Sequence, residues 1–411
     1  MGLLDEQKGR CTGSAEGTSV RRIGVLTGGG DSPGLNAAIR GVTLTAIRRY
    51  GMEVVGFIDG FSGLFQGEAG SVALTEDSVQ GIEMLGGTIL GTANRGNPFS
   101  MIVGDSQGRP LRDENGQILT RDRSQEAADR LQELGIEGLV CIGGDGTLSM
   151  AREFFEKLNV PLVGVPKTID FDLSGTAATF GFETAVQVAT EALDRLRTTA
   201  ESHDRVMILE LMGRYAGWIS LHAGLAGGAH AILLPELPYD AEAVYARVVE
   251  RFRRQRKFSL VVISEGAHAI DGMHSVAEER DHPDGLPVLG GAGERLRREI
   301  EQLAREEAER VVNAGDFPAE SPEIRVVVLG HVQRGGTPDP RDRVIATACG
   351  SHAVEMVATG RFGRMACWLG EGPGDVPLSE ATVPHLVQPE SDPLVQVARS
   401  IGICLGDSVD S

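Results

Sequence analysis

The sequence has no hydrophobic run long enough to cross a membrane. A membrane-spanning helix needs about 18 or more consecutive apolar residues, and none of the 411 residues begins such a run. Residues 1–22 also contain no apolar segment of signal-peptide length. We therefore expect a soluble cytoplasmic protein with no membrane partner.

Cysteine is scarce and irregularly spaced. The five cysteines show neither the paired spacing of a disulfide framework nor that of a zinc site, and two of them lie inside apolar runs. We expect reduced and mostly buried thiols at Cys11, Cys141, Cys349, Cys367 and Cys404.

The chain also lacks an excess of positive charge. Its 39 Lys and Arg residues face 58 Asp and Glu residues, which gives a formal net charge of −19. This balance argues against nucleic acid or an anionic membrane as a partner, but a few arginines could still form a local pocket for a small anion. The hydrophobic content of 41% is sufficient for a folded core.

Short apolar runs rich in Val, Ile and Leu alternate with segments of helical periodicity. Because the runs lack the polar–apolar alternation of half-exposed strands, we predict an α/β protein with mainly parallel sheets covered on both faces. The predicted strands lie at 22–27, 53–58, 138–144, 161–166, 205–211, 230–236, 258–266, 324–330 and 365–369. The clearest helical segments lie at 182–200, 240–257 and 292–315.

Four of these strands end in glycine-rich turns. In open α/β sheets, ligands bind at the carboxyl ends of strands, so we expect the turns to converge on one crevice, although each could also be a structural turn. The turns are TGGGDSPG (27–34), IGGDGT (142–147), LMGRYAG (211–217) and GHVQRGG (330–336).

The first two turns each lead into a helix, whose N-terminal N–H groups can bind an anion. The first is not a P-loop, because the Gly-Lys-Ser/Thr ending is missing. In the second, the carboxylate of Asp145 would repel a phosphate unless a cation lay between them. Asp145 is therefore a candidate Mg²⁺ ligand, with a helix cap as the alternative.

The segment PKTIDFD (166–172) places Asp170 and Asp172 on a turn directly after a strand. Two carboxylates facing one crevice could serve as a general base and its electrostatic or metal-linked support. A solvated acidic turn is the alternative.

Basic side chains also gather at strand starts and glycine turns. Arginines close to a crevice can bind phosphoryl oxygens with two hydrogen bonds each, whereas any one of them alone could form a surface ion pair. The candidates are Arg205, Arg214, Arg325, His331 and Arg334.

Taken together, these residues closely resemble the phosphofructokinase family. The motifs follow one another in the family's order over roughly residues 21–350, whereas GGDGT alone is also similar to NAD kinases and diacylglycerol kinases. The matching segments are GVLTGGGDSPGLNAAIRG, GGTILGTANRGNP, CIGGDGTLSMA, PKTID, FGFETA, MGRYAGWISL, ISEG and LGHVQRGGTPDPRDR.

The resemblance implies two α/β/α sandwich lobes and a homotetramer or homodimer. The phosphoryl-donor lobe would comprise residues 21–180 and about 332–385. The lobe for fructose 6-phosphate would comprise about 181–331 and 386–404. From composition we expect a polar surface insertion at 267–290 and flexible tails at 1–20 and 405–411.

The resemblance also implies roles for individual residues. Asp170 would take the proton from the 1-hydroxyl of fructose 6-phosphate, Thr168 and Asp172 would hold the transferring group and the metal environment, and Arg214 would neutralise charge. The donor would be held by Gly30, Arg95, Gly144, Asp145, Gly146, Thr147 and Lys167, with Mg²⁺ on Asp145.

For the sugar phosphate, the resemblance implies a second set of residues, in which two arginines typically come from a neighbouring subunit. The set is Thr168, Ile169, Asp170, Arg205, Met212, Gly213, Arg214, Glu265, Arg325, His331 and Arg334.

Two residues bear on the donor. In this family an Asp in place of Gly146 accompanies pyrophosphate use, so Gly146 favours ATP, whereas Lys167 resembles the pyrophosphate-dependent members. We give the glycine more weight, because an Asp would be sterically decisive and a lysine is compatible with both donors. The prediction is an ATP-dependent 6-phosphofructokinase of glycolysis, with the pyrophosphate-dependent enzyme as the alternative.

Phe171 departs from the family pattern, in which this position usually carries Asn. A non-catalytic sugar-phosphate sensor of the same fold is a further alternative. It is disfavoured because Asp145, Thr168, Asp170 and Arg214 are all present, and equal activity of an Asp170→Ser variant would support it.

Overall fold

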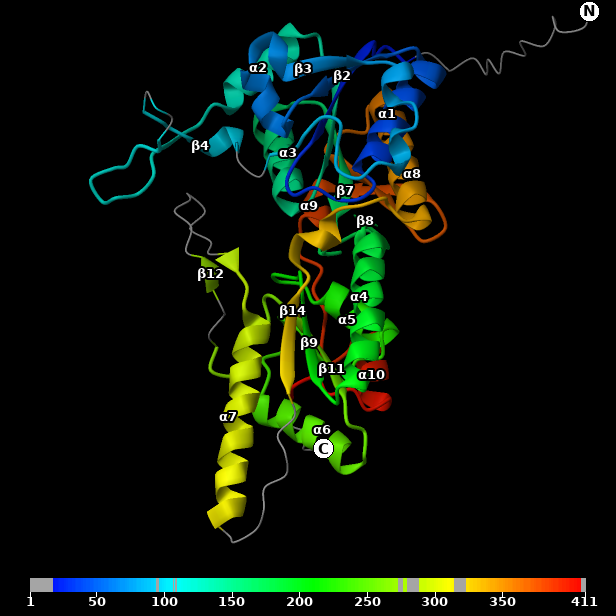
Figure 1. Ribbon diagram of the computed structural model, residues 1–411. Coiled ribbons are helices and arrows are strands. Elements are labelled where there is room, and N and C mark those ends of the chain that lie inside the picture. The colour runs from blue at the N-terminus through cyan, green and yellow to red at the C-terminus, as the bar shows by residue number, and fades with distance from the viewer. Residues whose placement is uncertain are drawn as a thin grey trace, which may run out of the picture.

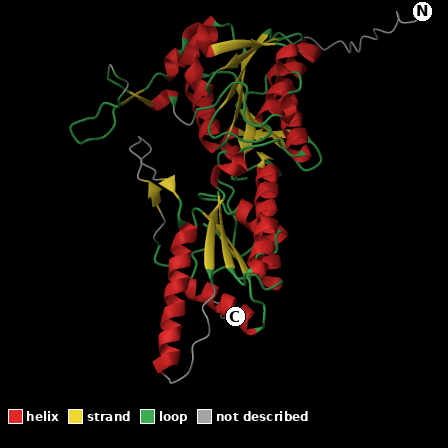
Figure 2. Cartoon of the chain, in the orientation of Figure 1, coloured by secondary structure: helices red, strands yellow, loops and turns green. Residues whose placement is uncertain are grey.

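The computed structural model describes residues 18–93, 96–105, 107, 109–272, 276–278, 288–313 and 323–407. The chain forms two lobes, one above the other in Figure 1. In each lobe a sheet lies between layers of helices (Figure 2). The predicted fold class, two α/β/α lobes with mainly parallel sheets, is confirmed.

The first lobe contains an eight-stranded sheet with the path β16-β15-β7-β6-β1-β2-β3, and β8 pairs with β7. The interior pairs are parallel, whereas the outer pairs β2–β3 and β15–β16 are antiparallel. The strands are β1 (Arg22–Thr27), β2 (Glu53–Phe57), β3 (Ser71–Leu74), β6 (Gly138–Gly143), β7 (Leu162–Thr168), β8 (Phe180–Gly181), β15 (Arg364–Trp368) and β16 (Pro373–Pro377).

Helices cover both faces of this sheet. On one face lie α1 (Leu35–Tyr50) and α8 (Pro340–Ala358), which share a core with β1, β6 and β7. On the other lie α2 (Ser124–Glu133), α3 (Asp145–Leu158) and the short α9 (Leu378–Ala381). The first pair crosses closely, because a Cβ on Gly350 would lie only 2.4 Å from the backbone oxygen of Ala38.

The second lobe contains a parallel sheet in the order β10-β11-β9-β14. Its strands are β9 (Val206–Leu211), β10 (Ala231–Leu233), β11 (Ser259–Ser264) and β14 (Ile324–Val328). One face is covered by α4 (Phe182–Ser202), α5 (Trp218–Ala226) and α10 (Pro393–Ser400). The other face is covered by α6 (Ala241–Arg253) and α7 (Ala292–Asn313) (Figure 1).

The remaining elements are short. They include two small antiparallel pairs, β4 with β5 and β12 with β13, of which the first lies on an arm that extends from the upper lobe in Figure 1. They are η1 (Gly60–Phe65), η2 (Gly67–Gly70), η3 (Asp77–Val79), η4 (Ile82–Met84), η5 (Pro98–Ser100), η6 (Gly330–Arg334), β4 (Met101–Ile102), β5 (Thr120–Arg121), β12 (Val276–Glu278) and β13 (Val288–Leu289).

The chain passes between the lobes three times: from β8 into α4, from β14 through η6 into α8, and from α9 through residues 382–392 into α10. Of the expected lobe boundaries, residue 180 lies in β8, residue 332 in η6 and residue 385 between α9 and α10. The first connection is held by Asp342 of α8, whose carboxylate accepts hydrogen bonds from the Thr184 amide at 2.9 Å and the Thr184 hydroxyl at 2.5 Å.

Two expected surface segments begin later than predicted. Ala267 and Ala269 are buried in the second lobe, so the start of the predicted insertion at 267–290 belongs to the core. Leu405 is also buried, and the Gly406 carbonyl accepts a hydrogen bond from the Asp240 amide, so the packed chain continues past residue 404. Of the predicted flexible tails at 1–20 and 405–411, residues 1–17 and 408–411 lie outside the described residues.

Among the residues that the structure describes, no helix is both long and apolar enough to cross a membrane. Four of the five cysteines are described, and all four are free and buried: Cys141, Cys349, Cys367 and Cys404.

Candidate active site

The carboxyl ends of β1, β6 and β7 meet at a cavity of about 250 Å³. Ten of the predicted site residues line this cavity, which brings together the first two glycine turns and the acidic turn after β7. They are Gly30, Gly144, Asp145, Gly146, Thr147, Lys167, Thr168, Asp170, Asp172 and Arg334.

The two glycine turns are in direct contact. A Cβ on Gly28 would lie 2.5 Å from the Thr147 hydroxyl oxygen, and one on Gly143 would lie 2.4 Å from the Thr147 Cβ. Only glycine fits at both positions, because larger residues would push the start of α3 away from β1. The sequence therefore sets the close approach of these two turns.

The N-terminus of α3 opens into the cavity. Gly144 precedes the helix, and no side chain of the described residues caps the first N–H groups. These groups and the positive end of the helix dipole are available to an anion. Asp145 at the first helical position is exposed, and the Thr147 hydroxyl is buried without a hydrogen-bond partner among the described residues.

Lys167 lies at the end of β7 and is buried, at 3% exposure. Its Nζ donates a hydrogen bond to the Gly30 carbonyl, so it holds the first glycine turn. Burial, with a smaller contribution from the charge of Arg334, lowers the pKa of Lys167 to about 8. With this pKa the amine is mostly protonated near neutral pH, and the charges of Asp170, Asp172 and Asp31 favour the protonated form.

Thr168 links the two acids of the turn. Its hydroxyl donates to Asp172 Oδ1 at 2.9 Å and accepts from the Asp170 amide at 3.0 Å. The other acid, Asp170, has one buried carboxylate oxygen, Oδ1, without a hydrogen-bond partner in the described part of the chain. A buried and unpaired carboxylate oxygen is costly, so it points to a bound proton donor or cation.

The electrostatics of the turn favour a proton acceptor. Burial, and then the charge of Asp172, raise the pKa of Asp170 to about 6. Partial desolvation of the carboxyl at the cavity, and then the charge of Asp172, also raise the pKa of Asp145. Carboxylates whose mutual repulsion raises their pKa values are suited to general-base chemistry near neutral pH and to binding a divalent cation.

The second lobe contributes Glu265, which follows β11. Its amide donates to the Leu211 carbonyl at 2.8 Å, and the Gly266 amide donates to Gly213 at 3.2 Å, so the turns after β9 and β11 are held together. Burial, and then the charge of Asp170, raise the pKa of Glu265 to about 7. The carboxylate of Glu265 is therefore close enough to Asp170, in the first lobe, for the two charges to interact.

The neighbouring MGR turn is only partly open to solvent. Met212 is 8% exposed, Gly213 has a φ of 139°, and the Arg214 guanidinium lies over the Tyr215 ring at 5.3 Å. This conformation of Gly213 favours glycine.

Arg334 and His331 come from η6, in the connection between the lobes. Arg334 lines the cavity and donates to the Asp31 carbonyl at 3.2 Å, and a Cβ on Gly30 would lie 2.8 Å from its Nη1. His331 is exposed.

Two predicted phosphate ligands lie elsewhere. Arg205 precedes β9 and Arg325 lies near the start of β14, and both form ion pairs with Glu323. Met212 and Glu265 follow the carboxyl ends of β9 and β11, at the opposite edge of the sheet from these arginines. The six residues of β9 separate the two edges by about 20 Å. Neither arginine can reach the cavity of its own chain in this conformation.

Two further predicted residues do not present a side chain to the cavity. The side chain of Ile169 is fully buried in the core of the second lobe, so only its backbone can face a ligand. Arg95 lies outside the described residues.

Phe171 has an unusual backbone conformation between the two acids. Its φ is 55°, in the left-handed region that bulky residues rarely adopt. Its ring packs against Phe182, Trp218 and His385 at centroid distances of 5.2, 5.6 and 4.8 Å. His385 is 214 residues away from Phe171 along the chain, and no local motif in the sequence indicates this contact.

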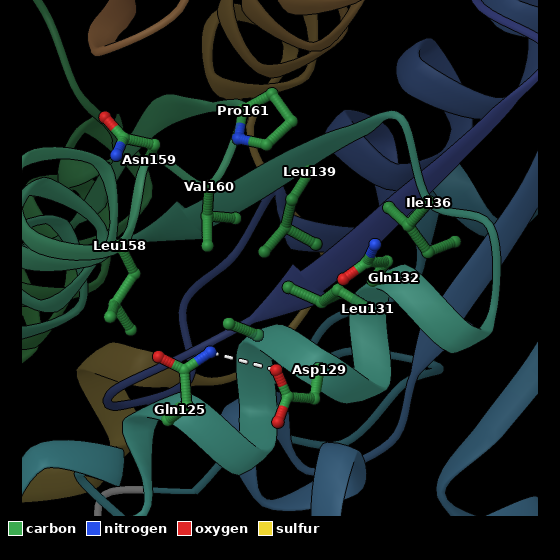
Figure 3. Close-up of a pocket in the computed structure, with 11 residues that line it drawn as sticks. Gln125, Asp129, Leu131, Gln132, Ile136, Leu139, Leu158, Asn159, Val160 and Pro161 are labelled. Atoms are coloured by element: carbon green, nitrogen blue, oxygen red, sulfur yellow. Dashed lines mark hydrogen bonds between the residues drawn. The ribbon is translucent and has the colours of Figure 1, made fainter.

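A second cavity, of about 280 Å³, lies at the opposite ends of β6 and β7 (Figure 3). It is bounded by α2 and by residues 158–161, and Gln125 donates a hydrogen bond to Asp129 at its edge. None of the described predicted site residues lines it. We therefore place the candidate active site at the first cavity.

Residues 22–357 match the phosphofructokinase family, and this match covers most of the chain. The chain belongs to the phosphofructokinase family.

Relatives with assigned names match over nearly their full length. An ATP-dependent 6-phosphofructokinase 2 of Clostridium perfringens is 45% identical over 94% of this chain and 99% of that protein. An ATP-dependent 6-phosphofructokinase of Chloroflexus aurantiacus is 46% identical, with coverage of 95% and 99%. A pyrophosphate–fructose 6-phosphate 1-phosphotransferase of Streptomyces coelicolor is 45% identical, with coverage of 88% and 94%.

Solved structures share the fold. A phosphofructokinase of Saccharomyces cerevisiae superposes with a TM-score of 0.67 at 28% identity, over 88% of this chain, which spans 45% of the yeast chain. A pyrophosphate-dependent phosphofructokinase of Marinobacter aquaeolei superposes with a TM-score of 0.69 at 21% identity, with coverage of 94% and 93%, which shows a common fold.

Proposed function

We propose that the chain is an ATP-dependent 6-phosphofructokinase, which transfers a phosphoryl group to the 1-hydroxyl of fructose 6-phosphate in glycolysis. The observation that carries this proposal is the unpaired buried oxygen of Asp170, which lines the same cavity as the uncapped N-terminus of α3. A base for a hydroxyl and a cradle for a phosphate thus share one site.

Space around Gly146 supports ATP as the donor. Gly146 is exposed, and a Cβ there would meet no atom within 4 Å among the described residues. The cavity is therefore open at the position where an Asp would add bulk and negative charge beside the phosphates. The names of the Clostridium and Chloroflexus relatives also favour ATP.

The acidic residues fit Mg²⁺ bound together with the donor. Among the described residues, no group of three or more His, Cys, Asp or Glu side chains could hold a metal by itself. Mg²⁺ commonly binds through one or two carboxylates and the phosphates of its substrate, so Asp145, with Asp172 nearby, is a suitable ligand set. When bound there, Mg²⁺ neutralises charge on the phosphoryl group.

The chain's own residues perform the remaining work. Asp170 accepts the proton of the 1-hydroxyl through its free Oδ1, and Thr168 fixes the turn by bonding to both acids. Lys167 and Arg214 offset negative charge on the transferring group. Such catalysis depends on positioning and charge rather than on covalent bonds to the protein.

We also propose that the 6-phosphate is bound by two subunits. Arg334 and His331 from η6 and Glu265 from the second lobe would hold the sugar phosphate in one chain. Arg205 and Arg325 would serve the site of a neighbouring copy, because they lie at the far ends of β9 and β14 from their own site. The assembly would be a homotetramer or homodimer in the cytoplasm.

The pyrophosphate-dependent enzyme is the second candidate. It is supported by Lys167, which lies against the first glycine turn and lines the cavity, and by the name of the Streptomyces relative. A point charge of this kind can bind the terminal phosphate of either donor.

Identification of the product tests the proposal. The full-length chain is incubated with fructose 6-phosphate, Mg²⁺ and either ATP or pyrophosphate, and the products are examined by ³¹P NMR. We expect a new phosphate monoester at C1 and its absence with Asp170→Asn. No bisphosphate from the unmodified chain with either ATP or pyrophosphate would refute the function, and equal product from Asp170→Asn would refute the site.

A further inference from the structure

We propose that His385 is a positioning residue, which holds the backbone of the catalytic turn so that Asp170 and Asp172 face the donor site. This inference rests on the proposed catalytic role of Asp170. His385 lies in the connection between α9 and α10, where the chain passes from the first lobe to the second.

His385 bonds to two successive carbonyl groups of the turn. Its backbone amide donates to the Asp172 carbonyl at 2.9 Å, and its Nδ1 lies 2.9 Å from the Phe171 carbonyl. A carbonyl oxygen can only accept, so Nδ1 carries the hydrogen in this contact. One residue thus fixes the peptide planes on both sides of Asp172.

The His385 ring is itself held in place. It stacks on the Trp218 ring with centroids 4.7 Å apart and an interplanar angle of 16°, while Phe171 meets it edge-on at 82°. The Trp218 indole N–H donates to the His385 carbonyl at 2.9 Å. Trp218 is 6% exposed, so the stack is part of the core of the second lobe.

Glu236 fixes this connection to the second lobe. Its Oε1 accepts from the Gly217 amide at 3.0 Å and from the Val387 amide at 2.9 Å. Gly217 directly precedes Trp218, and Val387 follows His385 by two residues. One carboxylate oxygen therefore holds both partners of the ring stack in register.

These contacts explain why the turn tolerates Phe171. A residue with a Cβ is disfavoured in the left-handed region, so the turn would relax by changing φ at Phe171. The hydrogen bonds from His385 hold the carbonyl groups of Phe171 and Asp172 and so oppose this change. Because the acids lie on either side of Phe171, a change of φ there would move their carboxylates relative to each other.

Two substitutions of His385 distinguish the effect of its aromatic ring from that of its side-chain hydrogen bond. His385→Phe keeps an aromatic ring for Trp218 but removes the N–H donor, whereas His385→Asn keeps a side-chain N–H donor but removes the ring. We expect His385→Phe to lower kcat by about tenfold or more, with the KM values for ATP and fructose 6-phosphate within about twofold. His385→Asn should retain kcat within about threefold.

His222→Phe is the matched control. His222 belongs to the same aromatic cluster, and its ring contacts Phe182 at 5.1 Å and Trp218 at 6.3 Å rather than the catalytic turn. We expect its kcat to match that of the unmodified enzyme. Thermal midpoints are recorded for all variants, and activity is measured well below them.

Amide hydrogen exchange of the segment 168–174 provides a readout that does not depend on activity. Exchange should be faster in His385→Phe than in His385→Asn, His222→Phe or the unmodified full-length chain. Equal kcat for His385→Phe and the unmodified enzyme, equal losses in both His385 variants, or unchanged exchange in His385→Phe would overturn the proposal. If the unmodified chain forms no bisphosphate, the proposed function fails, and the exchange result still decides whether His385 orders the turn.

Discussion

The Thr168 hydroxyl donates a hydrogen bond to the Asp172 carboxylate at 2.9 Å while it accepts one from the Asp170 amide. We predict that Thr168→Val lowers kcat by about 10- to 100-fold, because a hydrogen bond to a charged group contributes about 1.5–3 kcal/mol. Thr168→Ser keeps the hydroxyl and should retain most of the activity. Steady-state kinetics with a coupled assay measures both.

Thr190→Val is the control for that substitution. The Thr190 hydroxyl bonds only within α4, to the Val186 carbonyl at 2.8 Å, so its loss should leave kcat unchanged. If Thr168→Val and Thr168→Ser were equally active, the hydroxyl would have no part in ordering the acids.

Gly146→Asp should shift the donor preference away from ATP. The new carboxylate would stand in the open part of the cavity, beside the nucleotide phosphates, where repulsion costs several kcal/mol. We expect the ratio of kcat/KM for ATP to that for pyrophosphate to fall by at least about tenfold. Gln132→Asp adds the same charge on the exposed side of α2 and should leave the ratio unchanged.

The pH dependence of kcat/KM should reflect the protonation of Asp170 and Glu265. Burial raises the pKa of Asp170 to about 6 and that of Glu265 to about 7. A general base must be ionised to act, and protonation increases as the pH falls below its pKa, so kcat/KM should decrease from about pH 7 downward. Because the groups interact, the profile gives apparent pKa values for the cluster. A rate that stays constant down to about pH 5 would contradict the assignment.

Arg205 and Asp170 should complement each other across subunits. If Arg205 serves a neighbour's site, then chains with Arg205→Ala and chains with Asp170→Asn, each nearly inactive alone, should form intact sites when co-expressed. We expect the mixed assemblies to be much more active than either parent. Activity no greater than that of the parents would indicate that both residues act within one chain.

The crossing of α1 and α8 should not tolerate a side chain at Gly350. An added Cβ would lie 2.4 Å from the Ala38 oxygen, so Gly350→Ala should lower the free energy of unfolding by about 1–3 kcal/mol in spite of alanine's higher helix propensity. In Gly372→Ala the added Cβ meets no atom within 4 Å among the described residues, and the change should stay within about 0.5 kcal/mol. Thermal unfolding of both variants measures the difference, and equal midpoints would contradict it.

Much of the fold could be predicted from sequence because the buried parallel strands are continuous apolar runs. The predicted strands at 22–27, 138–144 and 324–330 agree closely with β1, β6 and β14. The antiparallel edge strands β3 and β16 were missed, since edge strands are half exposed and β16 (PGDVP) contains two prolines. Their pairing is set by the neighbouring strands rather than by their own composition.

The local part of the candidate site was also predictable, because the glycine turns and the acidic turn each follow a strand directly. Arg205 and Arg325 lie near predicted strand starts, but their common ion-pair partner Glu323 could be seen only with β9 and β14 side by side. The contact of His385 with Phe171 also involves Trp218, so three segments that are far apart in the sequence must meet. Phe171 itself gave no sign of its left-handed backbone, because bulky residues rarely adopt it.

The rate with each donor tests the central claim most directly. The purified full-length chain is assayed with fructose 6-phosphate and Mg²⁺, coupled through aldolase, with ATP in one series and pyrophosphate in the other. The open space beside Gly146 predicts a higher kcat/KM with ATP. Activity with pyrophosphate alone would contradict the account and would assign the donor preference to Lys167 instead.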